Sequence, residues 1–163
     1  MNPLKTSISP ADHRSSQLGP SACAFCDRAE IRDREIHRND LARAFPTNIP
    51  IVPGHVLICP IRCVKTFESL DDAEIKAIFD LLAAIKSALV KEFGAEGFNC
   101  AWNEGAVAGQ SVPHLHLHVV PRQKGDAGIH SYEPREFLYR PGTRLTSQEL
   151  ELRDVAMAIR KHL

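Results

Sequence analysis

Residues 109–122 read GQSVPHLHLHVVPR, and the three histidines in this stretch alternate with Leu115, Leu117 and Val119. Side chains of an extended strand point to opposite faces with a period of two, so a strand would gather the imidazoles on one face and the apolar side chains on the other. A helix would spread the same residues around its axis. At a rise of about 3.3 Å per residue, neighbouring imidazoles would stand ~7 Å apart, close enough to act on one small substrate.

Three histidines on one face of a strand are compatible with two kinds of chemistry. Neutral imidazole is a nucleophile, a general base and the commonest metal ligand, and it titrates near neutral pH. A glycine-containing loop at 105–111 precedes the histidines and would supply backbone N–H groups suited to a phosphate, which favours phosphoryl chemistry. A hydrolytic metal site built on all three histidines is the alternative, and it predicts that chelators abolish activity at once.

The stretch at 109–122 resembles the signature of the histidine triad (HIT) superfamily of nucleotide hydrolases and transferases. Two further segments, PGHVLICP at 53–60 and NEG at 103–105, agree with the family in order and spacing. The resemblance covers about residues 23–125. It implies a HIT-like α+β fold, with an antiparallel sheet of about five strands, one long central helix and a C-terminal helix, and two subunits joined in a homodimer. Hairpin-connected strands with helices segregated between them indicate the same α+β class.

The composition sets the size of the domain and excludes some partners. The chain has 163 residues, 44% of them hydrophobic, which is enough for one domain with a core. Twenty basic and twenty acidic residues cancel, and this balance argues against charge-driven binding to nucleic acid or to a membrane surface. We expect a flexible N-terminal arm at 1–20 and a single domain at 21–163.

The hydropathy pattern and the cysteines suggest the compartment. No apolar run approaches the ~18 residues that span a bilayer, and the first residues lack the apolar region of a signal peptide. The chain has five cysteines, an odd number that suggests thiols or metal ligands rather than a disulfide framework. Cys59 and Cys100 lie in apolar segments and are interpreted as buried small side chains. We therefore expect a cytoplasmic protein.

Apolar periodicity and turn residues predict the order of the elements. Asp71 and Glu74 have the spacing of a capping box, and an apolar helical stripe continues to Gly94, which suits the residue after a helix. Three prolines exclude a central strand from the irregular loop expected at 46–53. We expect a hairpin at 35–45 with its turn at 39–40, a strand at 55–61, a helix at 72–93, strands at 98–103 and 114–120, and a helix at 146–162 that opens with a second capping box at 146–149.

The family resemblance implies a role for each residue around the triad. The middle histidine, His116, would attack the α-phosphorus of a nucleotide and form a nucleotidyl-histidine intermediate. His118 would hold the non-bridging phosphate oxygens or the leaving group, and His55 would stand near the first triad histidine as an orienting group or simply close a turn. The remaining phosphate contacts would come from Asn103, Gly109, Gln110, Ser111 and Val112.

Cys23 and Cys26 form a C-x-x-C pair, which by itself is compatible with a metal site, a redox pair or an incidental arrangement. In zinc-containing members of the superfamily, the metal ligands are two such cysteines, the first triad histidine and a residue three positions beyond the proline of the buried strand. Those last two places hold His114 and Cys63. The third ligand is ordinarily histidine, so Cys63 is a departure, but three cysteines and one histidine form a legitimate tetrahedral set for structural Zn²⁺.

Recognition of the rest of a nucleotide is less defined. The position that usually presents Asp or Asn to the ribose hydroxyls falls on Thr47, and Asn48 follows it. Phe45 and Ile49 would either sandwich the base or belong to the core. The segment 132–140 interleaves aromatic residues with arginines, which suits either a second nucleotide or a structural role at a dimer interface or beneath the last helix.

The segment at 45–70, and especially PIVPGHVLICP at 50–60, is most similar to the dinucleoside polyphosphate hydrolase branch of the superfamily. This likeness implies an enzyme that cleaves adenine nucleotide derivatives, preferably diadenosine polyphosphates, at the α-phosphate. A nucleoside phosphoramidase and a phosphorylase that uses inorganic phosphate are alternatives within the same chemistry. A nucleotide-binding sensor or scaffold with little turnover is the alternative from another class.

Overall fold

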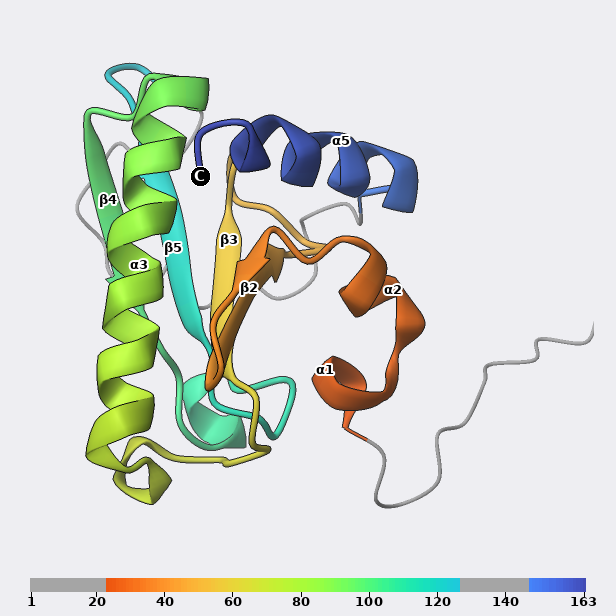
Figure 1. Ribbon diagram of the computed structural model, residues 1–163, viewed down its shortest axis with the longest axis vertical. Helices are drawn as coiled ribbons and strands as arrows, with labels where there is room; N and C mark the ends of the chain where they lie inside the picture. Colours follow the sequence, from red (N-terminus) through yellow and green to blue (C-terminus); the bar gives the residue numbers. More distant parts are fainter. Residues whose placement is uncertain (1–22, 127–146) are drawn as a thin grey trace, which may run out of the picture.

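The computed structural model describes residues 23–126 and 147–163. The predicted arm at 1–20 and the segment at 132–140 lie outside these residues. The described elements follow in the order α1 (Ala24–Asp27), α2 (Ala29–Asp33), β1 (His37–Arg38), β2 (Ala42–Pro46), β3 (Val56–Pro60), η1 (Phe67–Ser69), α3 (Asp72–Phe93), β4 (Gly97–Ala101), η2 (Ala106–Ala108), β5 (Leu117–Arg122) and α5 (Glu149–Arg160). The predicted α+β class is confirmed (Figure 1).

The five strands form one antiparallel sheet in the order β1-β2-β3-β5-β4. β3 pairs with β2 on one side and with β5 on the other, and all five of its residues are buried. The strand predicted at 55–61 is thus confirmed. α3 lies over one face of the sheet (Figure 1), and β5, which carries the last triad histidine, lies inside the sheet between β3 and β4.

The predicted hairpin at 35–45 is confirmed, and Asn39 stabilises its turn by accepting a hydrogen bond from the N–H of Ala42 (2.7 Å). The prediction that the irregular loop begins at Pro46 is wrong, because Pro46 ends β2 opposite Val56. Proline has no N–H to donate to a neighbouring strand. The short strand β1 stops before this point, so one side of Pro46 needs no donor.

α3 has the bounds that the sequence predicts. The side chain of Asp71 accepts a hydrogen bond from the N–H of Glu74, and the carboxylate of Glu74 accepts one from the N–H of Asp71, which completes the capping box. Gly94 ends the helix with φ at 62°, and its N–H donates to the carbonyl of Val90. A positive φ is strained for other residue types, so this glycine fixes the end of the helix.

The C-terminal helix α5 starts later than the sequence suggests. The second capping box predicted at 146–149 is not the helix start, because the helix follows Gln148, whose side chain makes no capping bond. The carboxylate of Glu149 accepts a hydrogen bond from Arg34, the residue after α2, at 2.8 Å. Thr146 lies outside the described residues.

Side chains pack on both faces of the sheet. The helix-side core lies between the sheet and the helices α3 and α5, and it contains Ile36, Ala42, Ala44, Val56, Ile58, Ala77, Ile78, Leu81, Ile85, Ala88, Leu89, Leu117, Val119, Ala156 and Ile159. The second core lies on the opposite face, under α1 and α2, and it contains Phe25, Ile31, Phe45, Leu57 and Cys59. In the described part of the chain, no helix is long and apolar enough to cross a membrane.

Candidate active site and thiol cluster

The segment that carries the triad belongs to the sheet only in its second half. β5 begins at Leu117, so the prediction of a strand over 114–120 is wrong at its start. The N–H of Leu115 donates instead to a carbonyl in the loop after β3 (2.6 Å). The alternation of faces is kept, because Leu117 and Val119 are part of the helix-side core while His116 packs against the second core on the opposite face.

His116 is held as a neutral imidazole with a defined tautomer. Its Nδ1 lies 2.8 Å from the carbonyl oxygen of His114, and because a carbonyl only accepts, Nδ1 carries the hydrogen. The lone pair is therefore on Nε2. Burial lowers the pKa of His116, against a smaller opposing effect of the hydrogen bond to His114. Phe25 fixes the plane of the ring through an edge contact, with centroids 5.1 Å apart and planes at 90°.

A chain of hydrogen bonds assigns the tautomer of His118 as well. The N–H of Ile51 donates to Nδ1 of His55 (3.2 Å), so in a neutral His55 ring the hydrogen is on Nε2. That Nε2 lies 3.1 Å from Nδ1 of His118 and donates to it. A neutral His118 then carries its own hydrogen on Nε2. The ring centroids of His116 and His118 are 4.9 Å apart, so a nucleophilic nitrogen and an N–H donor come from adjacent rings.

His55 is the one residue of this group that the sequence placed wrongly. It was expected beside the first triad histidine, and it contacts the last one instead. The register explains the difference, because Leu57 of β3 lies opposite His118 of β5. His55 is two residues before Leu57, so it points to the same face and reaches His118 diagonally.

Gln110, which the sequence predicts as a phosphate contact, holds the loop that precedes the triad in place. Gln110 uses both ends of its amide within the protein: Oε1 accepts from the N–H of Gly105 (2.9 Å), and Nε2 donates to the carbonyl of Lys65 (2.9 Å). Gly109 adopts a left-handed conformation with φ at 88°. Gln110 therefore shapes the loop through its side chain. The other predicted phosphate contacts are the buried Asn103, the exposed Ser111 and the partly buried Val112.

The predicted ribose position is close to the histidines. The N–H of Thr47 donates to the carbonyl of His55 (3.2 Å), and its buried hydroxyl accepts from the N–H of Ile49. Asn48 is exposed, so its side chain is the more accessible of the two. Phe45 is fully buried in the second core, which confirms the core interpretation for this residue, whereas Ile49 is exposed.

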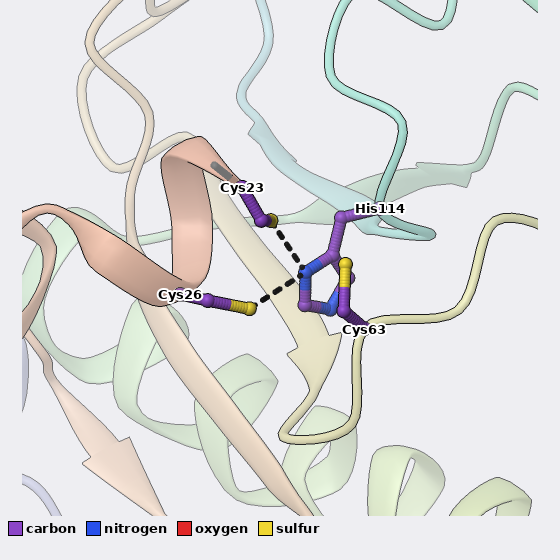
Figure 2. A group of neighbouring side chains, drawn as sticks. All are labelled: Cys23, Cys26, Cys63 and His114. Atoms are coloured by element: carbon purple, nitrogen blue, oxygen red, sulfur yellow. Dashed lines mark hydrogen bonds between the residues drawn. The ribbon is translucent and has the colours of Figure 1, made fainter. Parts of the chain in front are cut away.

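Three cysteines and the first triad histidine converge in a second arrangement, the thiol cluster (Figure 2). Its members are Cys23 and Cys26 at α1, Cys63 in the loop after β3, and His114, and their ligand atoms all lie within 4.8 Å of one another. Nδ1 of His114 is 3.2 Å from Sγ of Cys23 and 3.5 Å from Sγ of Cys26. Its Nε2 donates to the carbonyl of Pro60 (2.9 Å), so in the neutral ring the Nδ1 lone pair faces the sulfur atoms.

Two thiols of the cluster, those of Cys26 and Cys63, resist ionisation. Burial, together with the neighbouring Cys23, raises the pKa of Cys26 to about 12. Burial and Cys23 also raise the pKa of Cys63. Burial lowers the pKa of His114, which keeps this imidazole neutral. A neutral imidazole and three thiols that can each lose a proton to a metal form a tetrahedral donor set suited to Zn²⁺.

The remaining cysteines divide between interior and surface. All five cysteines are free thiols. Cys59 is buried, as predicted, whereas the prediction for Cys100 is wrong because that residue is exposed. β4 is the edge strand of the sheet, so apolar residues on it do not imply burial.

Sequence reasoning missed two residues of this region, Phe25 and Arg43. Phe25 lies between the two cysteines of the C-x-x-C pair and contacts the rings of both His114 and His116. Arg43 is buried in β2, and its Nη1 donates to the carbonyl of Phe25, which lies between two cysteines of the thiol cluster. The available signal for Arg43 was a charged residue between two alanines in a strand that is otherwise apolar.

Comparisons with known proteins agree with these features. The model of the HIT domain family matches residues 28–125. A bis(5′-nucleosyl)-tetraphosphatase (asymmetrical) of Schizosaccharomyces pombe is 38% identical over 102 residues, which are 63% of this chain and 56% of the relative, so the match spans little more than half of that protein. A bis(5′-adenosyl)-triphosphatase of Dictyostelium discoideum is 36% identical over 97 residues, 59% of this chain and 65% of the relative.

Solved structures show the same architecture. A Hit-like protein from Bartonella henselae superposes with a TM-score of 0.65 at 25% identity, covering 80% of this chain and 86% of the other. A Zn-bound histidine triad family protein from Mycobacterium smegmatis has a TM-score of 0.65 at 23% identity, covering 86% and 92% of the two chains. At that identity the second likeness concerns the fold.

Proposed function

The chain belongs to the HIT domain family, and we propose that it is a nucleotide hydrolase or transferase that cleaves adenine nucleotide derivatives at the α-phosphate through His116. The observation that carries the proposal is the pair of assigned tautomers: Nε2 of His116 has a lone pair, and Nε2 of the adjacent His118 has a hydrogen. The names of the yeast and Dictyostelium relatives make diadenosine polyphosphates the first substrates to test.

The proposed reaction has two displacements at phosphorus. Nε2 of His116 attacks the α-phosphorus, a P–N bond forms, and the bond from that phosphorus to the bridging oxygen breaks. The Nε2–H of His118 donates a hydrogen bond to the departing oxygen, which leaves as a phosphate anion. Water then attacks the nucleotidyl-histidine, the P–N bond breaks and returns His116 as a neutral imidazole, and the proton that the water loses passes to solvent. The phosphate oxygens are held by backbone groups of the loop around Gly109, by Ser111 and Val112, and by Asn103, while Asn48 or Thr47 contacts the ribose.

The test is a product analysis with diadenosine tetraphosphate, with and without inorganic phosphate. The hydrolase predicts AMP and ATP from the unmodified protein, and no products from His116→Ala. ADP and ATP formed only in the presence of phosphate would identify a phosphorylase instead. His37→Ala is a matched control, because His37 is exposed on β1, outside the site.

Other outcomes point to the alternatives. Absence of turnover would send the search to nucleoside phosphoramidates. Tight binding of adenine nucleotides with negligible turnover of all these substrates would contradict the enzyme and support a nucleotide-binding sensor. A trapped, acid-labile nucleotidyl-protein adduct that is missing in His116→Ala would exclude a hydrolytic metal site built on all three histidines.

The proposal includes a structural Zn²⁺ held by Cys23, Cys26, Cys63 and His114. The donor types, their mutual distances and the tautomer of His114 fit this ion. The bound ion would join α1 to the loop after β3 and to the start of the triad segment. Metal analysis of the purified protein should find one equivalent of zinc, and Cys63→Ser should lower the zinc content and the melting temperature. A full zinc content in that variant would remove Cys63 from the ligand set.

We also include a homodimer and a cytoplasmic location in the proposal. Among the described strands, β4 is at the edge of the sheet with β5 beside it, and Lys86 of α3 lies over the ring of Phe98 in β4. Phe79 and Val90 share the helix face of Lys86 by their spacing and are about half exposed. A second copy would cover this apolar face and continue the sheet. The mass in solution tests the dimer, and Phe79→Glu should give monomers.

A further inference from the structure

Arg43 of β2 is a buried arginine that has no carboxylate partner among the residues that the structure describes. Arg43 is 7% exposed, and its Nε is buried without a hydrogen-bond partner. Among residues 23–126 and 147–163, it makes no ion pair with an acidic side chain. A buried positive charge without a compensating negative charge is costly, so this position calls for an anion.

The contacts of Arg43 lead to the thiol cluster. Its Nη1 donates a long hydrogen bond (3.4 Å) to the carbonyl of Phe25, which lies between the two cysteines of the C-x-x-C pair. Across the sheet, Arg43 is in register with the buried Cys59. Cys59 is followed by Pro60, whose carbonyl accepts the hydrogen bond from Nε2 of His114. Arg43 therefore contacts the backbone between two cysteines of the cluster and lies across from the strand that holds His114.

The charge of the loaded cluster depends on Cys63. Three thiolates and one neutral imidazole around a divalent ion carry a net charge of about −1, because each cysteine loses its proton on binding. Two thiolates and two imidazoles would be neutral. We propose that Arg43 is the counter-charge of the thiol cluster and balances the negative charge that Cys63 adds when a divalent metal binds. This inference rests on the zinc site proposed above.

The competing interpretation is a purely structural role. The hydrogen bond to Phe25 ends on a carbonyl of α1, so Arg43 could hold this turn without regard to the charge of the cluster. The two roles differ in one respect. A structural role predicts that loss of Arg43 weakens zinc binding equally in any ligand set. A counter-charge affects zinc binding only where the loaded cluster is negatively charged.

The test is a cycle of zinc dissociation constants, measured by competition with a chromophoric chelator. The four proteins are the unmodified chain, Arg43→Met, Cys63→His and the double variant. We expect Arg43→Met to weaken zinc binding by roughly 10- to 100-fold in the unmodified chain, the size usual for residues that support metal ligands. In the Cys63→His background, whose centre is neutral, the same substitution should change the constant by less than about twofold.

Two further variants separate charge from folding. Arg43→Lys keeps the charge and should bind zinc within a few-fold of the unmodified protein. Arg34→Met is the matched control, because Arg34 is equally buried but pairs with Glu149 of α5, and it should leave the zinc constant unchanged. Circular dichroism checks that each variant is folded.

Each other outcome is decisive. Equal losses in both backgrounds, or a loss in Arg43→Lys as large as in Arg43→Met, would overturn the counter-charge and leave the zinc site intact. An unchanged zinc constant in Arg43→Met would do the same. An unmodified protein that binds no zinc would overturn the zinc site itself, and the role of Arg43 with it.

Discussion

The two faces of the sheet are built on different principles. On the helix-side face, β3 and β5 present Val56, Ile58, Leu117 and Val119 to α3, and the contacts are apolar and nondirectional. On the opposite face, the same strands carry or border imidazoles, thiols and a buried arginine, and their arrangement depends on individual hydrogen bonds. We therefore expect substitutions on the first face to change the stability and leave the activity, and substitutions of the histidines on the second face to remove the activity and leave the fold.

The largest expected effect comes from His116→Ala. Removal of the proposed nucleophile should lower kcat by at least about a thousandfold, because the covalent route would be lost. Few apolar contacts disappear, so the melting temperature should change by only a few degrees. Steady-state kinetics and thermal unfolding of the same preparation measure both. A His116→Ala variant that retains a tenth of the activity would contradict the proposed role of His116.

Leu117→Ala is the counterpart, one residue further along the chain and on the other face. Leu117 is buried in the helix-side core, and the cavity should cost about 2–5 kcal/mol of unfolding free energy. Activity measured well below the melting temperature should stay within a few-fold of that of the unmodified protein. Urea unfolding measures the change in unfolding free energy, and initial rates measure the activity. Loss of activity in the still-folded variant would mean that the two faces are coupled.

The helix-side face was the part that the sequence predicted well. A capping box, an apolar stripe and a glycine at the helix end are local signals, and they defined α3 to the residue. The apolar run of β3 and the turn at Asn39 were equally local. The start of α5 was misplaced, because the helix follows Gln148; the carboxylate of Glu149 pairs with Arg34, which is far away in the sequence.

The opposite face, which carries the histidines and the thiol cluster, could be predicted only in part, because its geometry depends on strand register and on residues that are distant in the sequence. The pattern of alternating histidines found the imidazoles, and family spacing found the four members of the thiol cluster. The contact between His55 and His118 follows from the pairing of β3 with β5. The tautomers follow from the carbonyls of His114 and Pro60. The spacing of residues in the sequence does not predict these hydrogen bonds.

A smaller effect is expected at His55, which directly precedes β3 and contacts His118. His55→Phe removes the donor to Nδ1 of His118 and should lower kcat roughly 10- to 100-fold with little change in KM, since the tautomer is no longer fixed. His55→Gln places an amide N–H near the former Nε2 and should recover part of the loss. A purely structural role would predict no such recovery at equal stability.

The smallest expected effect lies at the start of α3, where polar groups serve the fold alone. Asp71→Ala removes the cap and should cost about 1 kcal/mol of unfolding free energy without any change in kcat.

The pKa of Glu74 is lowered from 4.5, first by the hydrogen bond from Arg62 and also by the one from Asp71. The folded state therefore binds this proton less tightly than the unfolded chain does. The stabilisation is complete above about pH 4.5 and is lost as the pH falls through the lower folded-state value. Urea unfolding between pH 3 and 7 should show that Glu74→Gln removes this part of the pH dependence, and an unchanged profile would contradict the assignment.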